Sequence, residues 1–130
     1  MEMATKIAWL ALAAVHGSPA TVLFWPSLVQ RLYGVSPEGP AGLLLSHRGA
    51  TFLAVVVAAV WAAFDPPVRR MSTVLVGICV LGYLLVYVRA GMPEGPLRTV
   101  AAVDALAVAP LLLVAWSAWR PVPRRSPAGS

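Results

Sequence analysis

Two ionisable residues of opposite charge stand at equivalent positions after a repeated tetrapeptide. The sequence PEGP occurs at 37–40 and again at 93–96, and the eighth residue after its last proline is Arg48 in one copy and Asp104 in the other. A carboxyl group near a guanidinium can act as a general acid or base, or the two groups can neutralise each other. The spacing therefore raises two possibilities, proton transfer and an internal ion pair.

The hydrophobic surroundings of Arg48 and Asp104 favour contact between them. Each residue lies inside a long apolar block, about 12 Å along a helix with a rise of about 1.5 Å per residue. A lone charge at that depth in a membrane is costly, so such residues face the interior of a helical bundle and find partners there. We therefore predict that Arg48 and Asp104 approach each other as an intramembrane ion pair.

Two further residues complete the candidate catalytic group. His47 precedes Arg48 and is rotated by about 100° around the same helix, so only one of the two points at the bundle axis. A structural hydrogen-bonding histidine is the alternative to a catalytic one. Glu94, in the second PEGP segment, is the alternative to Asp104 as a general acid. The candidate catalytic residues are Asp104, Arg48, His47 and Glu94.

Other polar side chains could line a ligand pocket. His16 either bonds a backbone carbonyl freed by Pro19 or handles a proton or a ligand. Cys79, Tyr83 and Tyr87 share one stripe at helical spacing, although Tyr87 also suits a membrane interface. The candidate ligand-binding residues are His16, Glu38, Tyr83, Tyr87, Arg89 and Arg98.

Several other kinds of site are not expected. The chain has two histidines and one cysteine, which argues against a metal centre. It carries no nucleophile elbow, phosphate loop or dinucleotide fingerprint, so no cofactor is expected. Its net charge is +5, but apart from Arg48 and Arg98 the arginines lie in loops and the tail, without interleaved aromatic residues, which argues against nucleic acid as a partner.

The elements that must position these residues follow from hydropathy. Of the 130 residues, 59% are hydrophobic and 12% are charged, against about 25% charged in an ordinary soluble domain. Each apolar block has nearly the length of about 20 residues that a helix needs to cross a bilayer. The blocks, which predict four helices in one membrane domain over 1–120, are about 5–29, 42–64, 71–88 and 97–119.

Short loops rich in Gly and Pro separate the blocks and predict an all-α, up-down-up-down four-helix bundle. Lys and Arg are more frequent on the side that holds both ends, which places the N- and C-termini in the cytoplasm. The first block resumes after GSPA, which favours a retained span over a cleaved leader, and Pro19 and Pro26 should bend it. The basic, Pro-rich tail, 121–130, is predicted to be disordered.

The repeated PEGP has two interpretations. It can mark a duplication in which the first two helices correspond to the last two, as two pseudo-repeated helical hairpins. It can also be a helix start used twice, because proline is favoured in the first turn of a helix and glutamate suits the positive end of the helix dipole.

Three segments resemble a known family. RLYGVSP, LLLSHRGATF and VDALAV are similar to segments of the DoxX-like group of small bacterial four-helix membrane proteins, over about 30–119. The resemblance implies a bacterial inner-membrane protein with His47, Arg48 and Asp104 at recurrent polar positions. Some members are similar to membrane subunits linked to quinone-dependent oxidation of sulfur compounds, but no residue here identifies a quinone site. The first helix matches least well.

Three functions fit these features. The first is a membrane subunit or binding protein that holds a lipophilic small molecule. The second is an intramembrane isomerase or cyclase acting on an isoprenoid-like substrate by acid/base chemistry, with Asp104 or Glu94 as the acid. The third is a transporter subunit working as an oligomer. The expected partners are the lipid bilayer, a lipophilic molecule, and either further copies of the chain or another membrane protein.

Overall fold

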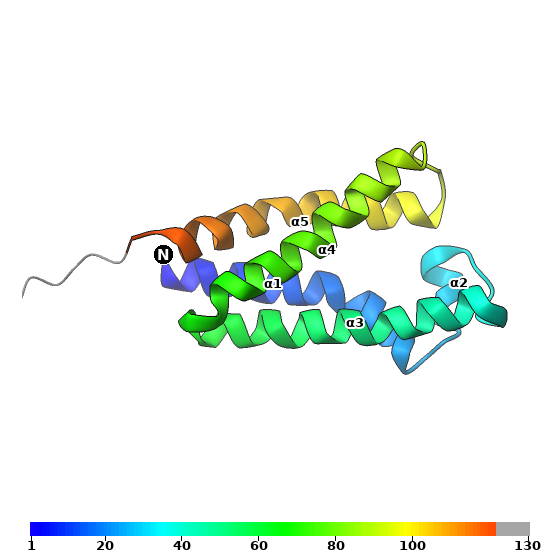
Figure 1. The fold of residues 1–130 in the computed structure, drawn as a ribbon, viewed down its shortest axis with the longest axis horizontal. Helices are drawn as coiled ribbons and strands as arrows, with labels where there is room; N and C mark the ends of the chain where they lie inside the picture. Colours follow the sequence, from blue (N-terminus) through cyan, green and yellow to red (C-terminus); the bar gives the residue numbers. More distant parts are fainter. Residues whose placement is uncertain (122–130) are drawn as a thin grey trace, which may run out of the picture.

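The computed structural model describes residues 1–121 and is helical in all its regular elements (Figure 1). Four of its helical segments are long and apolar enough to cross a membrane, as predicted: Glu2–Leu23, Gly39–Phe64, Pro66–Arg89 and Pro96–Trp119. The elements are, in chain order, α1 (Glu2–Ala20), η1 (Thr21–Leu23), α2 (Leu28–Tyr33), α3 (Gly39–Phe64), η2 (Pro66–Val68), α4 (Arg69–Arg89) and α5 (Pro96–Trp119). The predicted disordered tail, apart from Pro121, lies outside the described residues.

The prediction of one bent helix over 5–29 is wrong in its second part. The α-helix ends at Ala20, continues as the short 3₁₀ turn η1, and the chain then turns before the separate helix α2. Pro19 lies inside α1, but Pro26 lies in the turn between η1 and α2. A proline cannot donate the backbone hydrogen bond that a continuing helix needs. The hydroxyl of Thr21 also donates to the carbonyl of Ser18, at 2.6 Å, at the end of α1.

Both PEGP segments start helices, α3 in the first copy and α5 in the second. The glycine of each copy has a positive φ, +83° at Gly39 and +90° at Gly95, which glycine adopts without the steric penalty of a Cβ. The proline that follows lies in the first helical turn in both cases. The use of PEGP as a helix start therefore accounts for its local structure in both copies.

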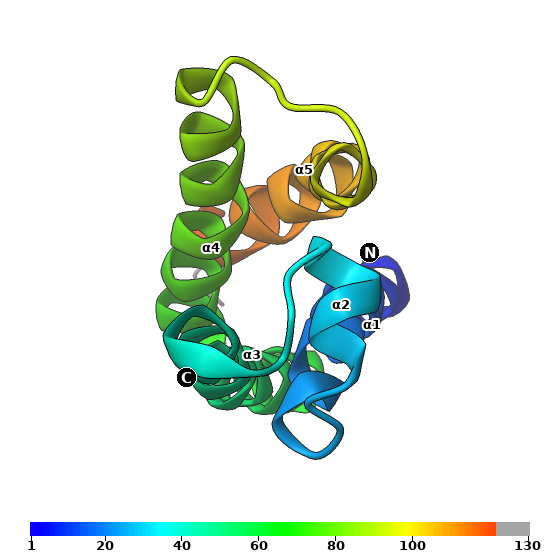
Figure 2. The same ribbon diagram turned by 90° about the vertical axis from the view of Figure 1, so that its right-hand side faces the viewer.

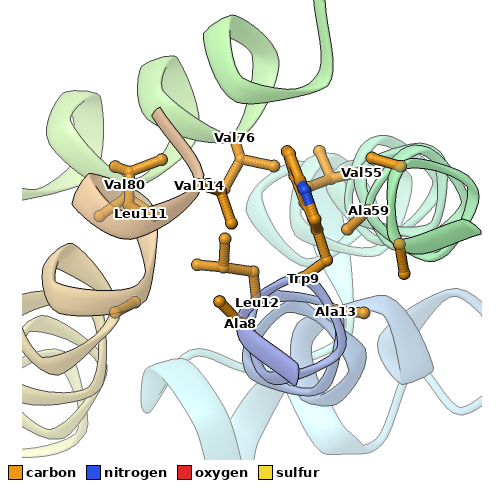
Figure 3. Packing of buried hydrophobic residues seen from close by; sticks show 13 residues of the cluster. Ala8, Trp9, Leu12, Ala13, Val55, Ala59, Val76, Val80, Leu111 and Val114 are labelled. Atoms are coloured by element: carbon orange, nitrogen blue, oxygen red, sulfur yellow. The ribbon is translucent and has the colours of Figure 1, made fainter. Parts of the chain in front are cut away.

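The main hydrophobic core lies around α1. The largest core side chains of α1, Trp9 and Leu12, are fully buried against Val55 of α3, Val76 of α4 and Val114 of α5 (Figure 3). Helix α1 packs mainly against α3 and α5, and α4 packs mainly against α5. The N-terminal helix is thus the central packing element of the fold.

Helices α4 and α5 diverge from α3 toward the end of the molecule opposite the N-terminus (Figure 1). Figure 2 shows the α4–α5 turn standing well apart from α3, with the short helix α2 between α3 and α5. A second, smaller core there consists of Val22, Val29 and Tyr33. Side chains from η1 and α2 therefore cover this end of the molecule. If the first helix continued straight, these side chains would not lie there.

Gly49 allows α3 to pack closely against η1. A Cβ atom at this position would lie 2.7 Å from the backbone nitrogen of Leu23, so the two segments would have to move apart. We expect Gly49→Ala to lower the free energy of unfolding by about 1–3 kcal/mol, measured by thermal unfolding in detergent. Gly77→Ala on α4 is the matched control, because a Cβ there meets no atom within 4 Å. The same loss in both variants would contradict the close-packing explanation.

Candidate functional site

A cavity of about 170 Å³ lies at the end of the molecule where α2 is inserted, and all five α-helices contribute to its wall. The apolar part of the wall consists of Val15, Pro19, Leu32, Phe52, Val100 and Val103. The polar part consists of His16, Ser18, Tyr33, Arg48, Tyr83, Thr99 and Asp104. The site thus combines a hydrophobic lining with a group of hydrogen-bonding and charged side chains.

Arg48 and Asp104 both line this cavity, so the structure places them at one site. The predicted direct ion pair is wrong, because the ion pairs found within residues 1–121 are Arg69–Glu2 and Arg98–Glu94. The guanidinium of Arg48 instead lies over two aromatic rings, 5.0 Å from the ring centroid of Phe52 and 5.9 Å from that of Tyr83.

Aromatic faces stabilise a cation and offer Arg48 an alternative to the carboxylate. No hydrogen bond from any residue in the described part of the chain reaches the carboxylate of Asp104. The two charged groups therefore both remain available to a molecule in the cavity.

His16 is buried in the wall, with 2% of its surface exposed. Its Nδ1 donates to the backbone carbonyl of Leu12 at 2.8 Å, and its ring packs on Phe52 with centroids 5.8 Å apart. The prediction that His16 bonds a backbone carbonyl is correct, but the carbonyl differs. Pro19 has no backbone N–H group, so the carbonyl that loses its hydrogen-bond donor is that of Val15, four residues earlier. The histidine therefore has a fixed orientation and a second ring nitrogen, Nε2, that is not used by the backbone.

The two tyrosines of α4 connect that helix to the start of α5. The hydroxyl of Tyr83 donates to the carbonyl of Leu97 at 2.9 Å, and that of Tyr87 donates to the carbonyl of Pro93 at 3.0 Å. Their rings stack with centroids 6.2 Å apart. Of the two, Tyr83 lines the cavity, whereas Tyr87 lines a separate groove.

Five other predicted site residues also lie away from the cavity. His47 is exposed, because the helical rotation that turns Arg48 inward turns its neighbour outward. Glu94 and Arg98 are exposed, lie 3.9 Å apart and border a separate, open groove together with Tyr87. Glu38 and Arg89 are exposed at helix ends. Glu94 therefore cannot replace Asp104 as an acid at this cavity.

Three polar residues of the wall were not predicted from the sequence: Ser18, Thr99 and, most deeply buried, Tyr33. Tyr33 lies on α2, is 9% exposed, and lines the cavity. Burial raises the pKa of the Tyr33 phenol, so the hydroxyl stays protonated and can donate a hydrogen bond at neutral pH. The sequence signal that could have indicated a short helix ending at Tyr33 is the glycine that follows it, because glycine commonly ends helices. In the structure Gly34 ends α2 with a φ of +69°.

Neither metal-ligand geometry nor a known relative defines the site. No group of three His, Cys, Asp or Glu side chains within residues 1–121 is arranged to hold a metal ion. No protein-family model, no curated protein and no solved structure matches this chain.

Proposed function

We propose that this chain is a DoxX-like integral protein of a bacterial inner membrane, with four helices in an up-down-up-down bundle and both ends in the cytoplasm. The arrangement is supported by the N-terminus, the α3–α4 turn and the end of α5, which lie at the same end of the molecule (Figure 1). The basic residues of these segments are Lys6, Arg69, Arg70 and Arg120. Clustered basic residues favour the cytoplasmic side.

The proposed function is to bind one lipophilic small molecule in the cavity. The observation that carries it is that Arg48 and Asp104 form no ion pair within residues 1–121 while both line a cavity with a large apolar part. A purely structural pair would bring the two charges into direct contact and would leave no cavity between the helices. A cavity of about 150 Å³ can hold one benzene molecule, so the volume found here suits a single ring or a group of similar size.

The proposed ligand reaches the cavity from the bilayer. Ser18 near the end of α1, and Thr99 and Val103 on α5, line the cavity and are also exposed at the surface. An opening between these two helices would face acyl chains in a membrane. A molecule dissolved in the bilayer can therefore place its polar end among the charged groups and leave its apolar body in the opening.

A catalytic form of the same function is favoured by the position of Asp104, a carboxyl group beside apolar side chains of the cavity that forms no ion pair in the described part of the chain. There it could act as the general acid of an isomerase or cyclase, with Arg48 tuning its proton affinity. Turnover of an isoprenoid-like substrate that Asp104→Asn abolishes, with an unchanged unfolding temperature, would establish this form. If the chain binds such a substrate without converting it, it acts as a binding protein and not as an enzyme.

Filling the cavity should abolish binding. We expect Val100→Phe to remove the stabilisation that a lipophilic probe such as 4-hexylphenol gives the full chain in detergent. A ligand at 100 times its Kd stabilises the folded state by about 2.7 kcal/mol, which a thermal unfolding assay resolves. Val57→Phe is the matched control, because Val57 is 54% exposed on α3 and does not line the cavity. The proposal fails if the probe stabilises Val100→Phe as much as the unchanged protein.

A further inference from the structure

The hydrogen bond of His16 determines which of its ring nitrogens carries the proton. A carbonyl oxygen only accepts, so the contact with Leu12 requires a proton on Nδ1. A charged ring would be costly in a position where 2% of the residue is exposed. In the neutral ring that remains, Nε2 carries a lone pair and can only accept a hydrogen bond.

This lone pair faces the cavity. Within residues 1–121, Nε2 of His16 has no hydrogen-bond partner. Among the described side chains, Trp9 Nε1 is the one polar atom that is both without a partner and completely buried, so Nε2 of His16 is not completely buried. Nε2 is therefore in contact with open space, and the space that the buried ring of His16 lines is the cavity. The same reasoning applies to the Tyr33 hydroxyl, which has no hydrogen-bond partner in the described part of the chain and belongs to a side chain lining the same cavity.

The charges on the wall favour a ligand without net charge. Arg48 and Asp104 contribute one formal charge of each sign, so an added carboxylate would meet Asp104 and an added ammonium would meet Arg48. An uncharged head group avoids both repulsions and does not need to lose a tightly held hydration shell.

Resting on the proposed binding function, we infer that the ligand has an uncharged head of about one ring with a hydroxyl group that donates to His16 Nε2. The chemical class is a lipophilic phenol or cyclic alcohol. While its O–H group donates a hydrogen bond to His16, the hydroxyl oxygen can also accept hydrogen bonds from the donors on the wall, Tyr33 and Arg48. The site should discriminate against an analogue that has no hydrogen-bond donor, because such a ligand leaves the buried acceptor Nε2 without a partner.

Two probes of nearly equal size test this inference with the full chain in detergent. 4-Hexylphenol carries the hydroxyl donor, and 4-hexylanisole carries a methyl ether at the same place on the same ring. We expect the phenol to bind about tenfold more tightly or better, from one retained hydrogen bond at a buried acceptor. His16→Phe should reduce this ratio to near one, and His16→Gln, which can present an acceptor at similar reach, should restore part of it. The negatively charged 4-hexylbenzoate should bind more weakly than the phenol.

The outcomes separate the two proposals. Equal binding of phenol and anisole to the unchanged protein would overturn the hydroxyl requirement and leave the binding function standing. Tighter binding of the benzoate would overturn the uncharged head. Absence of binding by all three probes would overturn both proposals. Because the phenol-to-anisole ratio is measured on the unchanged protein, the test does not depend on the folding of any His16 variant.

Discussion

Arg69→Leu is expected to lower the free energy of unfolding by about 3 kcal/mol or more. The side chain of Arg69 is 7% exposed at the start of α4. It holds Glu2 of α1 with two of its nitrogens, in the forked geometry that arginine and carboxylate favour. Its Nε donates to the carbonyl of Ala62 at 2.9 Å.

The loss should be large because Arg69 joins three helices at once. The carbonyl of Ala62 belongs to the last turn of α3, where backbone carbonyls have no partner within the helix. Removing the guanidinium leaves this buried carbonyl unsatisfied and releases the start of α1. Glu2→Gln should have a smaller effect, since the Glu2 side chain is 58% exposed and returns to water easily.

Arg70→Leu is the matched control for the adjacent position. Arg70 is exposed, although its Nε donates to the carbonyl of Ala118 at 3.0 Å. Arg70→Leu removes one positive charge from the same end of the molecule as Arg69→Leu, so both variants should change membrane orientation equally. We expect a change within about 0.5 kcal/mol, measured by chemical unfolding in detergent. If Arg69→Leu and Arg70→Leu were equally stable, the role given to the buried guanidinium would be wrong.

The second large effect is expected at the cavity. Arg48→Leu and Asp104→Leu should each lower the free energy of unfolding by about 2–4 kcal/mol. The two half-buried charges are not in direct contact, but they share one cavity wall, so each variant leaves a charge that nothing of opposite sign on that wall offsets. The double variant should be more stable than the sum of the two losses predicts, by about 1 kcal/mol or more, since it leaves no isolated charge. A double-mutant cycle in bicelles measures this coupling.

The matched control is a second cycle between Arg48 and Glu94. Glu94 is exposed and does not line the cavity, so its effect should add to that of Arg48 within about 0.5 kcal/mol. Additive losses for Arg48 and Asp104 as well would show that their charges act independently. The shared cavity would then reflect proximity without electrostatic coupling.

The long helices could be predicted from the chain alone, and so could two of their starts. Backbone groups cannot remain unpaired in lipid, so four long apolar blocks separated by Gly and Pro predict four helices. The helix-start interpretation of PEGP agrees with the positive φ of Gly39 and Gly95 and with the proline that follows each. These are local properties, decided by residues within a few positions of one another.

The end of the first helix could not be predicted from the same rules. Residues 5–29 are apolar almost throughout, and Pro19 is tolerated inside α1 although Pro26 is not inside any helix. The difference lies in tertiary contacts. Leu23 packs against Gly49, and Val29 and Tyr33 form a small core over the cavity. Such contacts between distant segments leave no periodic signal in the sequence.

Matching depth along two helices predicted a shared site for Arg48 and Asp104, and both line the cavity. That His16 and Tyr83 line the same cavity required the tertiary structure. The face of each helix could not be read from polarity, because membrane-length helices carry apolar side chains on both sides. Leu106 is 77% exposed and Leu111 of the same helix is 5% exposed, although they are chemically identical. For the same reason the contact of the buried Arg69 side chain with Glu2 could not be predicted. Local chemistry thus decides where helices form in this protein, whereas only packing between helices decides which polar side chains meet.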